Sequence, residues 1–407
     1  MDRVELAQTD GYRGRLAQGV EEHREQVLAL ARALHAHPET AFEEHRSAEA
    51  ITEVLAGHGF AVERGVGQLP TAFTATVGSG DLTVGICVEY DALPGIGHAC
   101  GHHLITGAGV SAALALAPLT EELGVTLRVI GTPAEEHGGG KVLLLERGVF
   151  DDLDLAVMVH ALPRGHGYNP AGSTTQAVGR WRATFHGAGA HAAAAPHRGV
   201  NAADAVVVSQ VAIGLLRQQL PGDHRVAAIV THGGDSTNVI PDKATLDFEC
   251  RAVRMPEFDA LVDKVRACLE GGALATGTTV EVEVTEPVYQ PLVHDDLLAR
   301  HWAEGLEVLG YDTTPGGGPQ GGSTDMGNVS RVVPSIHPWV SLPHTDAAIH
   351  TPAFAAAAVE DPALDAMLDS ALVMAMTVAA VAQSPQDIDA LRRRKVELAT
   401  LAEASQR

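Results

Sequence analysis

The chain has 407 residues, which is more than one compact core usually holds, so at least two domains are expected. Hydrophobic residues make up 45% of it and aromatic residues only 4%, which predicts a large core built from Ala, Val and Leu. Lys and Arg number 28 against 51 Asp and Glu, and a formal charge of −23 repels phosphate backbones and anionic lipid surfaces. We therefore expect neither a nucleic-acid partner nor a membrane partner.

The cysteines and the apolar runs favour a cytoplasmic protein. Cys87, Cys100, Cys250 and Cys268 are too few and too scattered for a disulfide framework in a chain of this length. The opening residues are acidic and polar, so no signal peptide is expected, and the Ala-rich tract over residues 372–382 is too short to cross a bilayer.

The first part of the chain alternates predicted helices and strands. Apolar positions at helical spacing predict amphipathic helices, and short runs of β-branched and apolar residues bounded by Gly and Pro predict strands. The helices are expected over residues 14–37, 47–58 and 104–116 and in a segment ending near Arg147, and the strands over 60–66, 71–78, 82–89, 125–131 and 155–159.

A loop rich in possible metal ligands follows the strand at 82–89. Thiolate and imidazole are preferred ligands of zinc and related ions, and the glycine of Cys100-Gly101-His102 tolerates a sharp bend that lets both side chains reach one cavity. Sites in open α/β sheets also form at the carboxyl ends of strands. The loop therefore predicts a metal site, with a solvated turn as the plainer alternative.

Two further strand ends carry chemically useful side chains. Glu135 and Glu136 follow the strand at 125–131, and because neighbouring side chains point to different sides of a strand, one can bind a metal while the other holds a proton. The glycines before Lys141 lack the full spacing of a phosphate-binding loop. His160 closes the strand at 155–159.

Near residue 177 the pattern changes to β-α-β-β-α-β, which predicts a split βαβ domain inserted into the larger α/β unit. The expected boundaries are residues 1–177 for the first part of the larger domain, 178–288 for the insertion and 289–407 for the second part. The predicted elements are strands over 179–186, 226–232, 244–251 and 278–285, helices over 200–219 and 256–271, and a late helix over 363–382.

Several motifs in order resemble the zinc amidohydrolases of the aminoacylase and glutamate-carboxypeptidase family. The branch that they resemble holds the indole-acetyl-amino-acid hydrolases, the p-aminobenzoyl-glutamate hydrolase subunit and the β-alanyl-lysine-type dipeptidase. The matching stretches are residues 89–102, 132–136, Val159-His160, 189–191, 233–234, 238–242, 322–330 and 349–352.

The resemblance implies an α/β catalytic domain, zinc-peptidase-like, whose central mixed sheet is flanked by helices, with an inserted α+β ferredoxin-like lid and dimerisation domain. It implies two divalent metal ions, Zn²⁺ first and Mn²⁺ or Co²⁺ as alternatives. The ligands carried over are Cys100, His102, Glu136, His160 and His350. Because a thiolate can bridge two cations, Cys100 is hypothesised to take the place of a bridging carboxylate.

The same resemblance assigns the remaining site residues. Glu135 is expected to be the general base, and Asp91 to orient a ligand. His191, in the inserted domain, is expected to stabilise the oxyanion, and Asn238 and Arg251 to bind the carboxylate or carbonyl of the substrate. The inserted domain is also expected to form a homodimer.

Other residues keep more than one interpretation. His103 stands where relatives usually have Asp or Asn, which leaves the local charge open, and His344 competes with His350 until the Thr-Pro-Ala-Phe after His350 decides for the latter. Arg251 has a plain ion pair with Asp247 or Glu249 as its alternative. Structural or supporting roles are expected for His98, His103 and His137, a substrate contact or a buried structural role for His337, and a supporting or helix-capping role for Asp325.

These features predict a metal-dependent amidohydrolase or metallopeptidase that cleaves N-acyl-amino acids or small dipeptides. Folate-fragment, dipeptide and N-acyl-amino-acid substrates all remain open. The alternative is a non-catalytic metal-binding relative that acts as a scaffold or subunit, but such a protein tends to lose the base or a ligand, and both are present here. A nicotinamide-dependent dehydrogenase is disfavoured because no Gly-x-Gly-x-x-Gly follows a strand.

Overall fold

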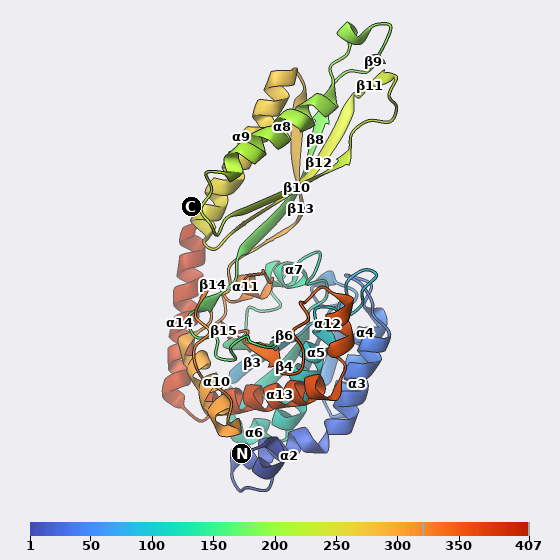
Figure 1. Ribbon diagram of the computed structural model, residues 1–407. Coiled ribbons are helices and arrows are strands. Elements are labelled where there is room, and N and C mark those ends of the chain that lie inside the picture. The colour runs from blue at the N-terminus through green and yellow to red at the C-terminus, as the bar shows by residue number, and fades with distance from the viewer. Residues whose placement is uncertain (320, 406–407) are drawn as a thin grey trace. The chain divides into compact units, whose positions relative to one another are not determined.

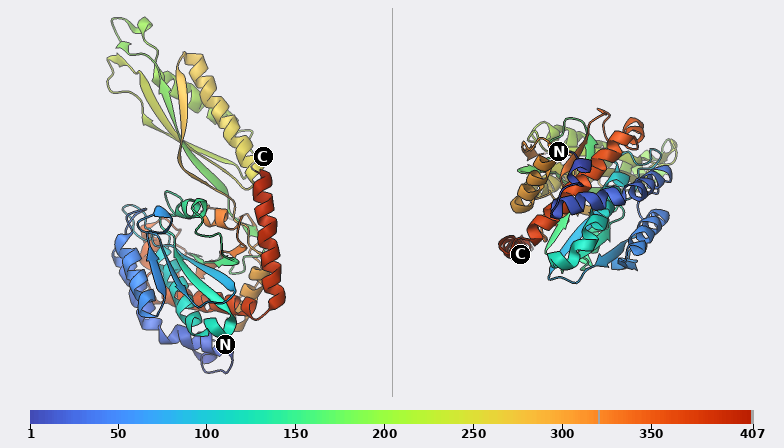
Figure 2. Two further views of the ribbon diagram at one scale, coloured as in Figure 1. Left: turned by 180° about the vertical axis from the view of Figure 1, so that it is seen from behind. Right: turned by 90° about the horizontal axis from the view of Figure 1, so that it is seen from below.

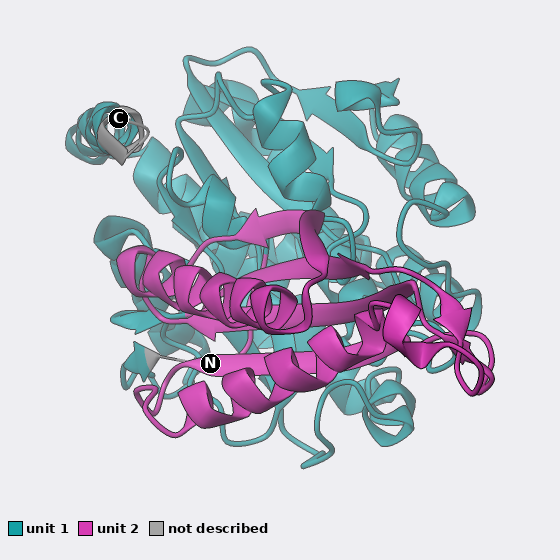
Figure 3. Cartoon of the chain, turned by 90° about the horizontal axis from the view of Figure 1, so that it is seen from above, with its two compact units in different colours: residues 1–174, 292–318, 325–407 teal, residues 175–291, 319–324 magenta. Residues whose placement is uncertain are grey.

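The computed structural model describes residues 1–319 and 321–405. The chain divides into two compact units (Figure 3). Unit 1 comprises residues 1–174, 292–318 and 325–407, and unit 2 comprises residues 175–291 and 319–324. The segment predicted as an insertion, 178–288, lies within unit 2. Residues 319–324, which the sequence interpretation placed in the larger domain, cluster with unit 2.

Figure 1 labels the elements. The helices are α1 (Arg3–Leu6), α2 (Tyr12–Glu22), α3 (Arg24–Ala36), α4 (His45–Gly57), α5 (His102–Leu116), α6 (Thr120–Leu123), α7 (Gly140–Glu146), α8 (Ala202–Arg217), α9 (Met255–Thr276), α10 (Asp296–Leu309), α11 (Met326–Val329), α12 (Pro352–Ala357), α13 (Asp361–Ala382) and α14 (Pro385–Ser405). The strands are β1 (Ala61–Arg64), β2 (Phe73–Val77), β3 (Leu82–Val88), β4 (Val125–Gly131), β5 (Leu155–Val157), β6 (His160–Pro163), β7 (Ser173–Thr174), β8 (Ala177–His186), β9 (Ala190–His191), β10 (Arg225–His232), β11 (Val239–Ile240), β12 (Lys243–Ala252), β13 (Thr279–Tyr289), β14 (Gly318–Pro319), β15 (Ser335–Ile336) and β16 (Trp339–Leu342).

Unit 1 is built on a mixed sheet with the order β1-β2-β4-β3-β5-β15. β3 pairs in parallel with β4 and β5, whereas β1, β2 and β4 pair antiparallel. Helices from both ends of the chain, coloured blue and red, surround this sheet (Figure 2). Parallel strands are normally covered on both faces, and β3 is accordingly buried along nearly its whole length.

The two faces of β3 contribute to separate clusters of buried residues. Val84, Ile86 and Val88 belong to the cluster that contains α5 and α13, whereas Cys87 belongs to a second cluster with Ile130. This division follows from the alternation of side chains along a strand. The sheet therefore has helices and loops packed on each face, and its strand ends are left as the place for a site.

Helices α5 and α13 pack against each other and form the centre of the larger cluster. Every residue of α5 is buried. The stretches His102–Leu123 and Asp361–Ala382 are long and apolar enough to cross a membrane by composition, but 89% and 83% of their most apolar windows are buried inside the fold. Such burial is typical of helices in the core of a folded domain.

Unit 2 is an antiparallel sheet with the order β10-β12-β8-β13, covered by α8 and α9. Its order along the chain is β8-α8-β10-β12-α9-β13, so the predicted β-α-β-β-α-β pattern and the ferredoxin-like expectation are confirmed. A separate two-stranded ribbon, β9 with β11, carries His191. The unit has its own core of Trp181, Phe185, Phe248 and neighbouring apolar residues.

Two predicted elements were wrong in their continuity. The single helix expected over residues 14–37 is two helices, α2 and α3, with a break at His23. The strand expected over 155–159 ends at Val157, and a new strand, β6, begins at His160 and pairs with β16 instead of the main sheet. In both cases buried apolar residues stand on either side of the break, because the segments before and after it pack in the same core.

Candidate active site

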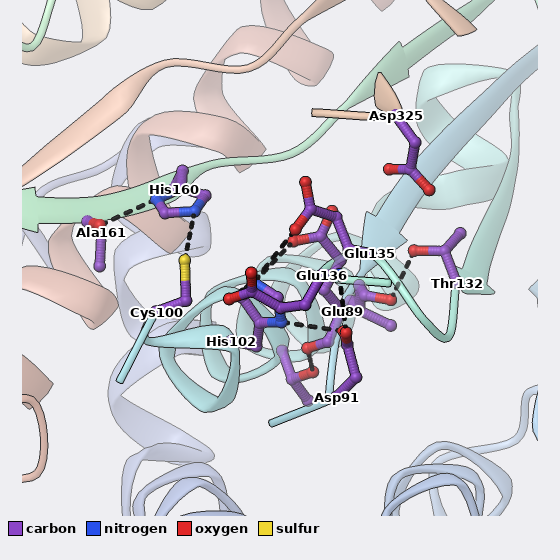
Figure 4. Close-up of polar contacts among 12 residues, drawn as sticks. Glu89, Asp91, Cys100, His102, Thr132, Glu135, Glu136, His160, Ala161 and Asp325 are labelled. Atoms are coloured by element: carbon purple, nitrogen blue, oxygen red, sulfur yellow. Dashed lines mark hydrogen bonds and ion pairs between the residues drawn. The ribbon is translucent and has the colours of Figure 1, made fainter. Parts of the chain in front are cut away.

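The site lies where three neighbouring strands of unit 1 end. β3 ends at Val88, which pairs with Gly131 at the end of β4, and Ile86 of β3 pairs with Val157 at the end of β5. Glu89 and Asp91 follow β3, Glu135 and Glu136 follow β4, and His160 follows β5. The parallel pairing brings these side chains together at one edge, as Figure 4 shows.

The Cys100-Gly101-His102 triplet bends into the same place. Gly101 has φ 82°, a left-handed conformation that glycine adopts without steric cost, and it directly precedes α5. The Cys100 Sγ lies 3.4 Å from His160 Nε2. His102 Nδ1 lies 2.9 Å from Asp91 Oδ1, so its Nε2 is directed at the opposite side, toward the glutamates. The predicted bend at the glycine is therefore present.

The donor atoms form overlapping groups of metal-ligand type. Within each of three groups all donor atoms lie within 4.8 Å of one another: Cys100, His102 and His160; Cys100, Glu136 and His350; and Glu89, His102 and Glu135. Cys100 is common to the first two groups. All predicted ligands therefore converge, and the shared thiol is the arrangement that a bridge between two cations requires.

Unpaired buried atoms test whether a cation fits these groups. Within the described residues, His102 Nε2 and Glu89 Oε2 are buried and have no hydrogen-bond partner. Burying such atoms without a partner is costly, and a bound cation would satisfy them. Burial also raises the pKa of the Cys100 thiol well above its usual range, so a thiolate there needs a nearby positive charge.

The charge around His102 points the same way. Burial, the largest single influence, lowers the pKa of His102, but the Asp91 carboxylate and the Cys100 sulfur together outweigh it, and the net pKa is well above the usual range. The surroundings therefore attract positive charge at this position. Sulfur, imidazole and carboxylate donors are the set that binds zinc and related divalent ions, so the residues present fit divalent metals.

Glu135 differs from Glu136 in its contacts. Glu136 Oε1 lies 3.4 Å from His350 Nε2, and its backbone N–H donates to Asp91 Oδ2 at 2.9 Å. Glu135 is buried and lies outside the two groups that share Cys100. Burial and the neighbouring Glu89 and Glu136 carboxylates raise the pKa of Glu135 well above its usual range. A buried carboxyl group with a shifted pKa is suited to proton transfer.

A buried acid cluster adjoins the site and was not predicted from the sequence. The Lys141 ammonium contacts Glu89 and lies 2.9 Å from Asp325 Oδ1, and all three side chains are inaccessible to solvent. The Lys141 backbone N–H also donates to Asp325 Oδ2 at 2.9 Å. One indication was available in the sequence: Lys141 is the single cation beside an apolar run, Val142 to Leu145.

Asp91 and Asp325 belong to none of the three ligand groups but hydrogen-bond to residues beside them. Asp91 accepts from the Glu136 backbone and hydrogen-bonds to His102, as expected of a residue that orients ligands. The side chain of Asp325 does not cap the helix α11 that follows it, and instead pairs with Lys141.

His191 and Asn238 lie side by side on the ribbon of unit 2. The Ala192 N–H donates to the Asn238 carbonyl at 2.9 Å, and His191 pairs with Val239. His191 is exposed, and its Nδ1 accepts from the Ala193 and Ala194 N–H groups. Arg251, on β12, pairs with Glu249 at 2.6 Å and donates to Ser323 Oγ at 3.1 Å. The substrate and oxyanion roles of these residues stay predictions.

The ambiguous histidines are largely explained by their contacts. His344 Nε2 lies 3.1 Å from the Ala357 carbonyl and belongs to no ligand group among the described residues, whereas His350 does. His103 Nε2 contacts the Ala358 carbonyl at 2.9 Å. Burial and the neighbouring His98 and His35 lower the pKa of His103 well below its usual range, so this ring is neutral and adds no positive charge.

His337 is fully buried, with its ring 5.7 Å from that of His160, and within the described part of the chain both of its nitrogens lack a hydrogen-bond partner. The role expected for His337, a substrate contact or a buried structural role, stays a prediction.

An α/β unit whose strand ends gather a thiol, imidazoles and carboxylates around an additional buried glutamate defines a metal-dependent hydrolase. The peptidase dimerisation domain family matches residues 174–276. The Xaa-Arg dipeptidase of Mus musculus is 37% identical over 399 residues, covering 93% of this chain and 91% of that protein. The chain belongs to the M20 family of metal-dependent peptidases and amidohydrolases, as its motifs indicated.

One further relative and one solved structure are also similar to the chain. A p-aminobenzoyl-glutamate hydrolase chain of Escherichia coli (strain K12) is 36% identical over 282 residues, which cover 64% of this chain and 58% of that protein. The Bacillus subtilis YXEP protein, a dinuclear metal binding peptidase from the M20 family, has a TM-score of 0.67 at 23% identity and covers 89% of this chain and 99% of its own. The protein is an enzyme that hydrolyses amide or peptide bonds with divalent metals, and the non-catalytic alternative is not favoured.

Proposed function

We propose that the enzyme is a dizinc dipeptidase that prefers a basic residue at the carboxyl end of its substrate. The convergence of the ligand groups on Cys100, beside a glutamate outside those two groups, carries the hydrolytic part of this proposal. Two facts support the preference: a relative that covers most of the chain is an Xaa-Arg dipeptidase, and the formal charge of −23 attracts cationic substrates.

The residues that would hold the metals are Cys100, His102, Glu136, His160 and His350, and Cys100 belongs to two of the ligand groups. When bound, divalent ions supply Lewis acidity that polarises the scissile carbonyl and makes water more acidic. Sulfur and nitrogen donors in this number favour Zn²⁺, with Mn²⁺ and Co²⁺ as alternatives.

The chain's own residues would carry the proton transfers. Glu135, as a carboxylate, would take a proton from the attacking water and then, as the carboxylic acid, deliver it to the leaving amine. Asp91 holds the His102 ring and the Glu136 backbone in position. His191 remains the residue proposed to bind the oxyanion, and Asn238 and Arg251 those proposed to bind substrate.

We also propose a homodimer formed through unit 2. Val207, Val211 and Leu215 are exposed at intervals of four along α8, so they form one apolar stripe. The adjacent strand β10 is an edge of its sheet and exposes Ile229 and Val230. An apolar helix face beside an open strand edge is suited to pairing with a second copy. The free cysteines and acidic surface are consistent with a cytoplasmic location.

A substrate panel tests the proposal. Dipeptides ending in Arg or Lys, an N-acetyl-amino acid and p-aminobenzoyl-glutamate would be assayed before and after chelation and after readdition of Zn²⁺, Mn²⁺ or Co²⁺. Glu135→Gln is expected to lower kcat by roughly 10²- to 10⁴-fold with metal content retained. Glu146→Gln, on α7 and away from the ligand groups, is the matched control and should be fully active.

Three results would count against the proposal in different ways. Turnover that survives removal of the metal would refute the metal-dependent mechanism. Full activity of Glu135→Gln would refute the assignment of the base. A preference for p-aminobenzoyl-glutamate over the basic dipeptides would refute the substrate class alone.

A further inference from the structure

Glu44 is a buried carboxyl group that the proposed mechanism does not use. It is completely inaccessible to solvent and directly precedes α4. A polar side chain at the N-cap position can cap its own helix, but the Glu44 side chain makes no capping hydrogen bond. Glu39 does this instead, accepting from the Arg46 and Ser47 backbone N–H groups at 3.1 and 2.8 Å. Glu44 is therefore available for another contact.

That contact is with the loop that carries Glu135. Glu44 Oε1 accepts from the backbone N–H of Ala134 at 2.9 Å, across 90 positions of the chain. Ala134 has φ 60°, a left-handed conformation that a residue with a Cβ adopts only when its surroundings hold it there. The Ala134 carbonyl in turn accepts from the Gly139 N–H at 3.0 Å. The residue before Glu135 is thus fixed on both sides.

The same loop is held at two other backbone N–H groups by buried carboxylates. Asp91 accepts from Glu136, and Asp325 accepts from Lys141, each at 2.9 Å. Asp91 also hydrogen-bonds to the His102 ring, and Asp325 also forms an ion pair with the Lys141 ammonium, so both carboxylates have a second role. In the described part of the chain, Glu44 is the one of these three carboxylates that hydrogen-bonds neither to a proposed metal ligand nor to Lys141.

A second contact from the Glu44 segment supports this. The Phe42 ring packs directly against Gly138 in the Glu135 loop, because a Cβ built on Gly138 would lie 2.4 Å from that ring. Phe42 itself has φ 63°. The short segment from Phe42 to Glu44 therefore touches the loop both before and after the two glutamates.

From these contacts we infer that Glu44 is a positioning residue for Glu135: its hydrogen bond to Ala134 fixes the backbone conformation from which the proposed base reaches the reacting atoms. The inference rests on the proposed role of Glu135. Proton transfer depends on placement to within a fraction of an ångström, and a 1 Å displacement costs about 10²-fold in rate. Loss of the Glu44 contact should accordingly reduce the chemical step more than substrate binding.

The experiment compares three substitutions at one position. Glu44→Met removes the acceptor at similar size, Glu44→Gln keeps an acceptor oxygen, and Glu44→Asp keeps the carboxylate but shortens its reach. We expect Glu44→Met and Glu44→Asp to lower kcat roughly 10- to 100-fold with KM within about 3-fold and metal content unchanged. Glu44→Gln should restore kcat to within about 3-fold of the parent. If Glu44→Met does not fold, Glu44→Asp against Glu44→Gln carries the same comparison.

The control is Glu39→Met, which removes a carboxylate from the same segment but only uncaps α4; it should lower the melting temperature and leave kcat unchanged. A normal kcat in folded Glu44→Met or Glu44→Asp, a defect in KM alone, or Glu44→Gln as slow as Glu44→Met would overturn the inference. Glu135→Gln measured in parallel separates the two hypotheses. If Glu135→Gln is active, the proposed base is refuted. If Glu135→Gln is inactive and Glu44→Met is fully active, only the role of Glu44 is refuted.

Discussion

Replacing Lys141 by Met should destabilise unit 1 strongly. The Lys141 ammonium is fully buried between Glu89 and Asp325, and the substitution leaves two carboxylates without their cation in a space closed to water. Removing one partner of a buried ion pair costs about 3–5 kcal/mol, because the remaining charge keeps its desolvation penalty. We therefore expect a loss of at least about 3 kcal/mol and a fall in melting temperature on the order of 10 °C.

The assay is chemical and thermal unfolding at pH 7 and at pH 5. Burial raises the pKa of Asp325 to about 6 even with Lys141 present, although Lys141 opposes that shift. Without Lys141 this carboxyl group should be protonated at pH 5, so the deficit of Lys141→Met should be smaller there than at pH 7. Lys264→Met, at an exposed position on α9, should change stability by less than about 0.5 kcal/mol.

A second set of variants provides the refutation. The triple variant Lys141→Met/Glu89→Gln/Asp325→Asn removes the stranded charges and should recover much of the lost stability. If Lys141→Met unfolds like the parent, or if the triple variant is no more stable than Lys141→Met, the ion cluster is not what holds this part of the core together.

Two further outcomes are expected. Burial and Asp91 raise the pKa of Glu44 from 4.5 to about 7. The protonated Glu44 carboxyl group is therefore compatible with the fold at low pH, and stability is lost as the group ionises between pH 4.5 and pH values above 7. Unfolding measured against pH should therefore show Glu44→Gln gaining about 3 kcal/mol on the parent between pH 4.5 and 8, and parallel curves would contradict this. Light scattering should find a dimer for the parent and for Leu274→Glu, an exposed control, but a monomer for Val211→Glu; a dimeric Val211→Glu would exclude the α8 stripe as the interface.

The convergence of the ligands was predictable because each motif stands at a strand end. β3, β4 and β5 were visible as apolar runs, and the side chains that follow parallel strands meet at one edge. Strand ends therefore marked the segments of Cys100, Glu135 and His160 as candidates for a site, and the family resemblance joined them in one metal centre. The resemblance then supplied His350, which has no strand before it that would reveal its position.

The supporting residues could not be found in the same way. Glu44 precedes a helix, where a carboxylate has an ordinary capping role, and nothing local shows that Glu39 has taken that role. Lys141 follows three glycines and appears as part of a turn. Their partners, Ala134 and Asp325, are distant in sequence, and only the folded chain shows which buried charges and backbone groups meet.

Helix and strand breaks were missed for a related reason. Periodicity reports which face of a segment is buried, not the direction of its axis. Val20 and Val27 lie in the same core on either side of the break at His23, so the apolar pattern runs on although the helix does not.

The split of unit 1 around unit 2 also constrains how the enzyme is made. A nascent chain that ends within unit 2 already contains Cys100, His102, Glu136 and His160, yet neither His350 nor α13 has been synthesised. Until α13 emerges from the ribosome, the apolar surface of α5 that it covers lacks its partner and is open to aggregation or chaperone binding. The proposed metal centre therefore gains its last ligand, His350, only late in synthesis of the chain.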